Sequence, residues 1–301
     1  MHGGALRRRK FFEQRQGRWK VWRMNVHFEN SGAVMGTVVT GVDLRREPDV
    51  PTAQLLYKAF LENGVLGIRG QNLTPQQYLT VGRIFGDPQV QLLADYRLED
   101  QPEITIISNF NKMGNGKPHV RATYWHTDDS YFAVPAKATL LHARALPSSG
   151  GDTGFINCQA VLEAMPGPLR LRITGRRAVH KYLSRRGRAK VAVRTADEQT
   201  ATPDVSHPLI RTHPETGIAS LYINPNRIDH VEGMSEADSD ALLDEVYAFA
   251  FEERFQYRYK WQLGDVVIWD NRCTMHRANT DFDVNQRREF HRILLKGTKP
   301  Q

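Results

Sequence analysis

The sequence predicts an α+β protein with a mainly β core, and three observations support this class. The chain has 301 residues, of which 40% are apolar and 25% charged, so it can build the core of a soluble globular domain. Its second half consists mainly of short apolar segments rich in β-branched and aromatic residues. Its first half mixes helical and strand-like patterns. We therefore expect a β-sandwich or barrel flanked by helices rather than a doubly wound parallel sheet.

Helices are predicted where apolar residues recur at helical spacing between start and stop signals. Proline favours the first turn of a helix, and glycine favours its end. Ser235 precedes Asp238 by three positions, a pattern that resembles a capping box. These signals predict helices over residues 53–62, 75–86, 159–165 and 235 to about 253.

Strands are predicted where short apolar runs lie between turn-forming residues. The run VLGIRG has the composition of a buried strand, and Ser149-Gly150-Gly151-Asp152 is a turn signal. The pattern predicts strands over residues 65–70, 103–108, 138–146, 255–261, 264–270 and 289–297.

The net charge of +8 lies almost entirely in the first 23 residues. Eight basic residues and one acid, Glu13, give residues 1–23 a charge of 8 − 1 = +7, which leaves 8 − 7 = +1 for the rest. We expect residues 1–23 to be a basic, disordered extension that the activity does not need, and residues 24–301 to form one domain. The alternative is an arm that binds nucleic acid or a membrane surface.

A second basic stretch lies inside this domain. Residues 170–194 contain ten Lys or Arg residues and no acid. This segment is predicted to be a basic insertion, and two interpretations remain open. It is either a mobile lid that steers anions, or a solvated face or contact between subunits.

Composition excludes several classes of protein. No run approaches the roughly 18 apolar residues that a membrane span requires. The two cysteines, Cys158 and Cys273, are too few for a disulfide framework or a cysteine-rich zinc module. We expect a cytoplasmic protein that binds neither membrane nor nucleic acid.

The segment WHTDDSY carries the most informative chemistry. His126 and Asp128 are two residues apart, so in a strand both would point to one face. His276 follows the apolar run GDVVIWDN and supplies a third donor. Two histidines and one carboxylate form the facial triad that suits non-heme Fe(II) with open coordination positions. Two other His-x-Glu pairs, which begin at His213 and His230, lie in polar or turn-like surroundings and fit a metal site less well.

Two arginines after His276 predict an anion-binding site. Arg288, Phe290 and Arg292 share parity, so in a strand they face one way. A buried guanidinium matches a carboxylate, and Thr153 after the Gly-Gly-Asp turn offers a hydroxyl to the same anion. The alternative for Arg288 is an ordinary surface ion pair.

Four segments together, WHTDDSY, PSSGGDT, GDVVIWDNRCTMH and QRREFHR, resemble the Fe(II)/2-oxoglutarate-dependent dioxygenases of the taurine dioxygenase and 2,4-dichlorophenoxyacetate dioxygenase family. The resemblance extends from about Val39 to Lys299. It implies a double-stranded β-helix, or jelly roll, with helices outside. It also implies a cytoplasmic enzyme that forms a homo-oligomer, either a dimer or a tetramer.

The resemblance also implies roles for individual residues. His126, Asp128 and His276 match the iron ligands. Thr153 and Arg288 match the residues that hold the distal carboxylate of 2-oxoglutarate, and Arg292 matches a position that contacts the substrate's anionic group. The implied reaction uses O2 to hydroxylate a C–H bond of a small carboxylate or sulfonate, with succinate and CO2 as co-products.

The chain departs from the taurine enzyme at Gln91, Ala94 and Ala122, where that enzyme has His, Tyr and Asn. The phrases HVEGM and WDNRCTMHR are closer to the phenoxyacetate branch. An aryloxyalkanoate is therefore a better expectation than taurine.

Two alternatives remain: a metal-binding jelly-roll enzyme that does not use 2-oxoglutarate, and a non-catalytic module that binds through its basic segments. The first predicts Arg288 and Thr153 far from the metal donors, and the second predicts salt-dependent binding of nucleic acid.

Overall fold

The computed structural model describes residues 26–188 and 191–301. The basic extension predicted over residues 1–23 lies outside this part of the chain. Within these ranges, no helix has both the length and the apolar character that crossing a bilayer requires.

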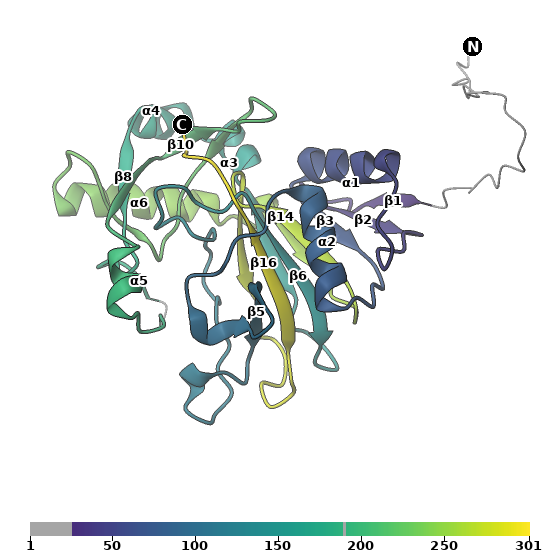
Figure 1. Cartoon of the computed structure of the whole chain (residues 1–301). Helices are drawn as coiled ribbons and strands as arrows, with labels where there is room; N and C mark the ends of the chain where they lie inside the picture. The colour runs from purple at the N-terminus through teal and green to yellow at the C-terminus, as the bar shows by residue number, and fades with distance from the viewer. Residues whose placement is uncertain (1–25, 189–190) are drawn as a thin grey trace, which may run out of the picture.

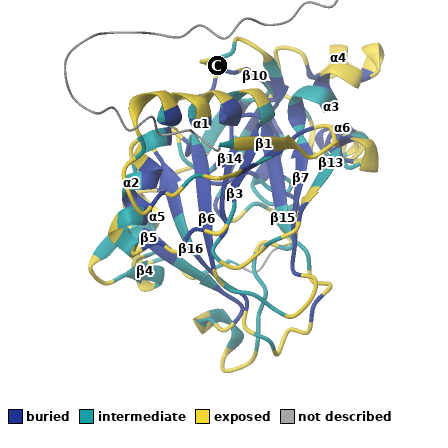
Figure 2. Cartoon of the chain, turned by 90° about the vertical axis from the view of Figure 1, so that its right-hand side faces the viewer, coloured by how far each residue is buried: buried dark blue, intermediate teal, exposed yellow. Residues whose placement is uncertain are grey.

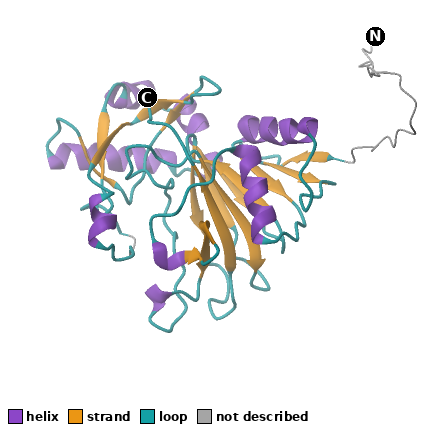
Figure 3. Ribbon diagram, in the orientation of Figure 1, coloured by secondary structure: helices purple, strands orange, loops and turns teal. Residues whose placement is uncertain are grey.

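An eight-stranded sheet forms the centre of the protein (Figures 1 and 3). Its strand order is β1-β2-β3-β14-β6-β16-β5-β4, and neighbours are antiparallel except for β2 and β3. Strands far apart in sequence thus become neighbours at its centre. Its members are β1 (His27–Asn30), β2 (Thr37–Thr40), β3 (Val65–Ile68), β4 (Arg97–Leu98), β5 (Gln101–Ser108), β6 (Ala138–Ala145), β14 (Val266–Asp270) and β16 (Glu289–Leu295).

A second, three-stranded sheet packs against the inner face of the first. Its order is β13-β7-β15, with β7 (Thr153–Asn157) between β13 (Gln256–Tyr259) and β15 (Thr274–Ala278). Figure 2 shows that β6, β14 and β7 are almost entirely buried, and the first three residues of β15 are buried as well. Apolar burial drives this packing, and the side chains between the two sheets are Val65, Leu141, Phe155, Tyr259, Val267, Trp269 and Phe290.

Helices α1 (Val50–Asn63) and α2 (Pro75–Phe85) cover the outer face of the large sheet (Figure 1). Their apolar sides pack on β3, β6, β14 and β16, whereas the outward side of α1 is exposed (Figure 2). The buried side chains in this layer include Leu56, Phe60, Tyr78, Phe85, Ile68, Leu140, Ile268 and Ile293.

Local signals fix the ends of these two helices. The Asp49 side chain accepts a hydrogen bond from the backbone of Thr52 at the start of α1, and Gly64 ends α1 in the left-handed region at φ 68°. Thr74 and Gln77 form a reciprocal capping box at the start of α2. Each cap satisfies backbone groups that a helix end leaves unpaired.

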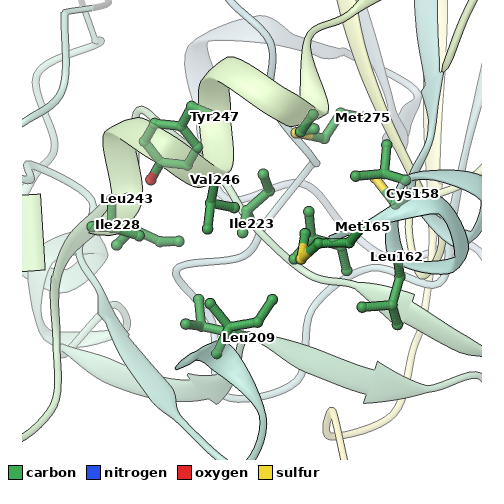
Figure 4. Close-up of a cluster of buried hydrophobic side chains, with 14 of the residues drawn as sticks. Cys158, Leu162, Met165, Leu209, Ile223, Ile228, Leu243, Val246, Tyr247 and Met275 are labelled. Atoms are coloured by element: carbon green, nitrogen blue, oxygen red, sulfur yellow. The ribbon is translucent and has the colours of Figure 1, made fainter. Parts of the chain in front are cut away.

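The remaining elements form a lobe on the opposite side from α1 and α2 (Figure 1). In Figure 4, Leu243, Val246 and Tyr247 of one long helix point toward Ile223 and Ile228 in an apolar cluster. The lobe contains α3 (Cys158–Ala164), α4 (Gly167–Ile173), α5 (Ala196–Thr200), α6 (Glu236–Ala250), β8 (Arg177–His180), β9 (Val205–Pro208), β10 (Ile210–Thr212), β11 (Ala219–Leu221) and β12 (Ile228–Val231). Three short 3-10 helices are η1 (Ala94–Tyr96), η2 (Lys112–Gly114) and η3 (Glu253–Phe255).

The structure agrees with the predicted class: it is mixed α/β and mainly sheet. The four predicted helices and six predicted strands are all present, with ends shifted by a few residues. The largest shifts are three residues, at the start of α1 and at the end of α6, which ends at Ala250 because the chain turns into η3 before β13. The segment WHTDDSY is different, because it forms a single bridge and a turn rather than a strand.

Candidate active site

One pocket of about 190 Å³ opens between the two sheets and the lobe. It is lined by all six residues that the sequence predicted as a site: His126, Asp128, Thr153, His276, Arg288 and Arg292. The structure therefore brings together residues that are up to 166 positions apart, from His126 to Arg292.

The two histidines face each other through their backbones. His126 and His276 form an isolated antiparallel bridge, in which the His126 N–H donates to the His276 carbonyl at 3.1 Å and the His276 N–H donates back at 2.8 Å. Their ring centroids are 4.1 Å apart. His276 lies in β15, whose pairing with β7 fixes its position.

A turn, not strand alternation, brings Asp128 close to the two histidines. The prediction that strand alternation aligns His126 with Asp128 is wrong, because residues 128–131 form a turn. Asp129 adopts the left-handed region at φ 57°, and its carbonyl accepts from the Phe132 N–H at 2.9 Å. Aspartate tolerates this conformation better than most residues. The turn directs Asp128 into the pocket.

The three side chains form a compact donor set. Nε2 of His126 is 3.8 Å from Oδ1 of Asp128, and Nε2 of His276 is 3.6 Å from Oδ2. One donor atom from each residue lies within 4.8 Å of the others. This spacing suits one ion bound by two imidazoles and a carboxylate.

The protonation states also suit a metal. Burial lowers the pKa of His126, and burial together with the neighbouring His126 lowers the pKa of His276 to about 3. Burial alone would raise the pKa of Asp128, but His276 and Arg292 outweigh it and lower the value to about 2. Neutral imidazoles and an ionised carboxylate are the forms that ligate metals.

Hydrogen bonds orient two of the donors. His126 Nδ1 lies 2.8 Å from the Tyr124 carbonyl, which can only accept, so Nδ1 carries the proton and Nε2 presents its lone pair. The Thr139 hydroxyl donates to Asp128 Oδ2 at 2.7 Å. Asn271 Nδ2 in turn donates to the Thr139 oxygen at 2.8 Å, and Trp269 Nε1 donates to Asn271 Oδ1 at 3.1 Å.

Arg288 lies directly before β16 and is 5% exposed. Its Nε donates to the Gly151 carbonyl at 2.8 Å, and its Nη2 lies 3.5 Å from the Thr153 hydroxyl. The guanidinium lies over the Phe290 ring at 4.5 Å. Burial lowers its pKa to about 10, so it stays charged at neutral pH. No described carboxylate forms an ion pair with it, which leaves a buried cation ready for an anion.

Arg292 lies on β16 on the same side as Arg288. Its Nε donates to the Thr105 hydroxyl at 3.2 Å and its Nη2 donates to Gln91 Oε1 at 3.1 Å. Its Nη1 is 3.9 Å from Asp128 Oδ1. The parity argument that grouped these two arginines is confirmed, because both line the pocket.

The sequence analysis missed several residues that line this pocket. Arg121, Arg227 and Tyr182 carried no recognisable motif. Thr139 and Asn271 were missed because their role depends on tertiary contacts with Asp128. Of the aromatic residues in and near these segments, Tyr131 and Trp269 line the pocket, whereas Trp125, Phe132 and Tyr222 do not.

Acids neutralise part of the basic stretch 170–194. Arg172 pairs with Glu245, Arg185 with Asp240, and Arg186 with Asp240 and Asp244, all on α6. Lys181 pairs with Asp204 and Asp229. Near its end the stretch turns toward the pocket, which Tyr182, Val191 and Ala192 help to line.

A second group of potential donors, His213, Asp270 and Cys273, is occupied by protein contacts. His213 Nε2 is 3.0 Å from Asp270 Oδ2, and Arg272 holds both oxygens of Asp270. Arg272 also pairs with Glu215, which lies in a turn as predicted. These contacts make the group a buried ion-pair network rather than an open metal site.

A His–Asp–His donor set and a buried arginine without a described acidic partner thus share one pocket in a sheet-rich fold. This combination is typical of non-heme iron enzymes with an anionic cosubstrate.

Comparison with known proteins identifies the family. The family model described as "Taurine catabolism dioxygenase TauD, TfdA family" matches residues 27–294, and the chain belongs to this family. The chain is 32% identical to the alpha-ketoglutarate-dependent 2,4-dichlorophenoxyacetate dioxygenase of Cupriavidus pinatubonensis, over 84% of this chain and 92% of that one. It is 31% identical to the (S)-phenoxypropionate/alpha-ketoglutarate-dioxygenase of Sphingobium herbicidovorans, over 88% and 93%.

A solved structure gives the same result. The chain superposes on a taurine dioxygenase from Burkholderia xenovorans with a TM-score of 0.77 and 31% identity, over 91% of this chain and 92% of that one. The resemblance predicted from the sequence is therefore confirmed. The protein is a 2-oxoglutarate-dependent non-heme iron dioxygenase that uses Fe(II), 2-oxoglutarate and O2. This result selects the enzyme over both alternatives considered above.

Proposed function

We propose that this enzyme hydroxylates a C–H bond of a small organic carboxylate or sulfonate and releases succinate and CO2. Aryloxyalkanoates are better candidates than taurine. The observation that carries the proposal is the pocket itself, which combines the His–Asp–His set with Arg288 and Arg292. In this proposal residues 24–301 form one domain with a double-stranded β-helix at its core.

His126, Asp128 and His276 hold the iron in this proposal. Fe(II) and 2-oxoglutarate, when bound, activate O2 for attack on an unactivated C–H bond. The protein contributes geometry: the reciprocal backbone bridge holds the two imidazoles, and Thr139 restrains the carboxylate. Because both imidazoles are neutral, no proton must leave them before the metal binds.

Arg288 and Thr153 bind the distal carboxylate of 2-oxoglutarate. The Gly151 carbonyl holds Arg288 Nε, so the terminal amino groups of the guanidinium are directed into the pocket. Trp261 Nε1 donates to the Thr153 oxygen at 3.0 Å, which leaves the hydroxyl proton for the anion. A charge-assisted contact in this buried place gives affinity and orientation.

Arg292 binds the anionic group of the primary substrate. Gln91 and Thr105 accept from two of its nitrogens and hold the guanidinium beside Asp128. Tyr131, Tyr182 and Trp269 give the pocket aromatic walls that suit an aryl ring. The names of two relatives, which refer to phenoxy acids, support the same substrate class.

The end of the basic stretch covers the substrate in this proposal. Tyr182, Val191 and Ala192 contribute a wall of the pocket, while the preceding arginines are anchored to α6. We propose that this part of residues 170–194 acts as a lid that excludes water during turnover. The enzyme is also proposed to be a cytoplasmic homo-oligomer.

Spectroscopy tests the proposal directly. Under anaerobic conditions, Fe(II) and 2-oxoglutarate are expected to give a weak visible charge-transfer band, and substrates are expected to perturb it. Succinate formation is expected to rise more with 2,4-dichlorophenoxyacetate than with taurine. An iron-loaded, folded protein that shows no band with 2-oxoglutarate would refute the cosubstrate assignment.

A further inference from the structure

The substrate side of the pocket contains more positive charge than one monoanion needs. Three guanidiniums line it in addition to Arg288: Arg121, Arg227 and Arg292. Among the described residues, the only acids in its lining are Asp128 and Asp129, so four positive and two negative charges leave +2. Fe(II) raises this sum to +4, and the 2-oxoglutarate dianion returns it to +2. A buried surplus of like charge is costly unless a counter-charge binds.

Two of the three guanidiniums already have partners that limit their freedom. Arg292 is held by Gln91 and Thr105 beside the metal donors. Arg227 donates to the Tyr182 carbonyl and lies over the rings of Tyr131 and Tyr182 at 4.8 and 4.7 Å. These contacts hold both cations in the pocket, and Arg292 also lies 3.9 Å from the Asp128 carboxylate, which is counted in the sum above.

Arg121 differs from both. Its guanidinium lies over the Tyr96 ring at 4.6 Å, but its side chain makes no hydrogen bond or ion pair with any residue in the described ranges. Burial lowers its pKa, and repulsion from the nearby Arg292 lowers it further. Arg121 thus brings to the pocket lining a guanidinium whose five N–H donors have no described hydrogen-bond acceptor and whose one described contact is with an aromatic ring.

We propose that the natural substrate is an organic dianion, with one acidic group bound by Arg292 and a second bound by Arg121. This inference rests on the proposed function and specifies its substrate class. Four aromatic side chains line the same pocket as the two guanidiniums: Tyr96, Tyr131, Tyr182 and Trp269. The best-fitting substrate is thus an aryloxyalkanoate that carries a second carboxylate or sulfonate on its ring. Two charge-assisted contacts also fix the orientation of the C–H bond that reacts.

Matched pairs of probes test the proposal on the full chain loaded with Fe(II) and 2-oxoglutarate without O2. One pair is phenoxyacetate and 4-carboxyphenoxyacetate, and the other is propane-1-sulfonate and 3-sulfopropanoate. The shift of the charge-transfer band gives each Kd. At least one dianion is expected to bind about tenfold or more tightly than its matched monoanion, with a preference that shrinks at high salt.

Substitution of Arg121 identifies the group responsible. Arg121→Gln is expected to bring the ratio of the two Kd values close to one, and Arg121→Lys to restore part of the preference, because lysine keeps the charge but loses the planar fork. Arg83→Gln removes an exposed arginine on α2 and is expected to keep the wild-type ratio. Circular dichroism confirms that each variant is folded.

The outcomes separate this inference from the proposed function. If 2-oxoglutarate gives the band but both monoanions bind as well as their dianions, or no dianion binds, the dianion proposal is overturned and the dioxygenase assignment stands. A preference that survives in Arg121→Gln also overturns it. If 2-oxoglutarate gives no band at all, the proposed function itself fails.

Discussion

The arginines of the basic stretch 170–194 and the arginines of the pocket have the same chemistry and opposite surroundings. In the stretch, Arg172, Arg185 and Arg186 each pair with a carboxylate on α6. In the pocket, Arg121 and Arg288 have no acidic partner among the residues that the structure describes. A charge run in the sequence therefore marked a surface that is partly neutralised by ion pairs, whereas the arginines without a described acidic partner lie in the pocket.

The largest expected effect is the loss of the carboxylate donor. Asp128→Ala is expected to lower succinate formation by at least about 1,000-fold, because it removes the only anionic donor of the three. Asp240→Ala, which removes an acid of the stretch's surface network, is expected to retain turnover within about twofold. Full turnover in Asp128→Ala would show that the metal is held elsewhere.

A buried ion pair and an exposed ion pair should contribute differently to the free energy of unfolding. Arg272→Met leaves Asp270 buried without its main partner and is expected to lower the free energy of unfolding by about 3–5 kcal/mol. Arg172→Met breaks an exposed pair with Glu245 and is expected to cost less than about 1 kcal/mol. Urea denaturation at pH 7 measures both, and equal losses would contradict the distinction.

Arg288, which has no described acidic partner, should determine the affinity for 2-oxoglutarate. Arg288→Gln removes the charge proposed to hold the distal carboxylate and is expected to raise the Kd of 2-oxoglutarate by about 10- to 100-fold. Its neighbour Arg287 is exposed and pairs with Glu289, so Arg287→Gln is the matched control with an unchanged Kd. Anaerobic titration of the charge-transfer band gives both values. A similar Kd in the two variants would place the anion away from Arg288.

Loss of the neutral hydrogen bond from Thr139 to Asp128 should have a smaller effect. Thr139→Val keeps the shape of the side chain but removes the hydroxyl that donates to Asp128. The variant is expected to bind Co(II) about 10-fold more weakly, because the carboxylate loses its restraint. Thr80→Val, whose hydroxyl donates only to a helix carbonyl in α2, is expected to bind Co(II) like the wild type. Unchanged affinity in Thr139→Val would make that hydrogen bond irrelevant to the metal.

The smallest expected effect concerns a buried histidine outside the site. Burial lowers the pKa of His142 from 6.5 to about 4. Between these two pH values the unfolded chain therefore binds a proton at His142 and the folded chain does not. Stability from this group is therefore present above pH 6.5 and is lost as pH falls. Between pH 6.5 and 5, the wild type is expected to lose about 1–2 kcal/mol more than His142→Gln. Parallel pH profiles of the two proteins would contradict this assignment.

Local signals were sufficient for much of the fold. Apolar spacing, Pro75 and the glycines at 64 and 86 predicted α1 and α2, because these signals act within one turn of the helix end. Strand parity placed Arg288 and Arg292 on one side, and both line the pocket although β16 has a register shift against β6 between Glu289 and Phe290. Parity failed for His126 and Asp128, since a left-handed Asp129 and a turn decide their directions. Arg121 and Thr139 could not be found at all, because only the assembled pocket gives them neighbours.

The mutual backbone bridge between His126 and His276 has a consequence for how the site can be assembled. The two residues are 150 positions apart, and each donates to the other's carbonyl. Because of these two hydrogen bonds, the backbones of the two histidines hold each other in place. The complete donor set therefore forms only once β15 has paired with the rest of the fold. A nascent chain that stops before residue 274 would contain only two of the three donors, so its metal site would be incomplete. The metal is thus expected to bind late in folding and to stabilise only the complete fold.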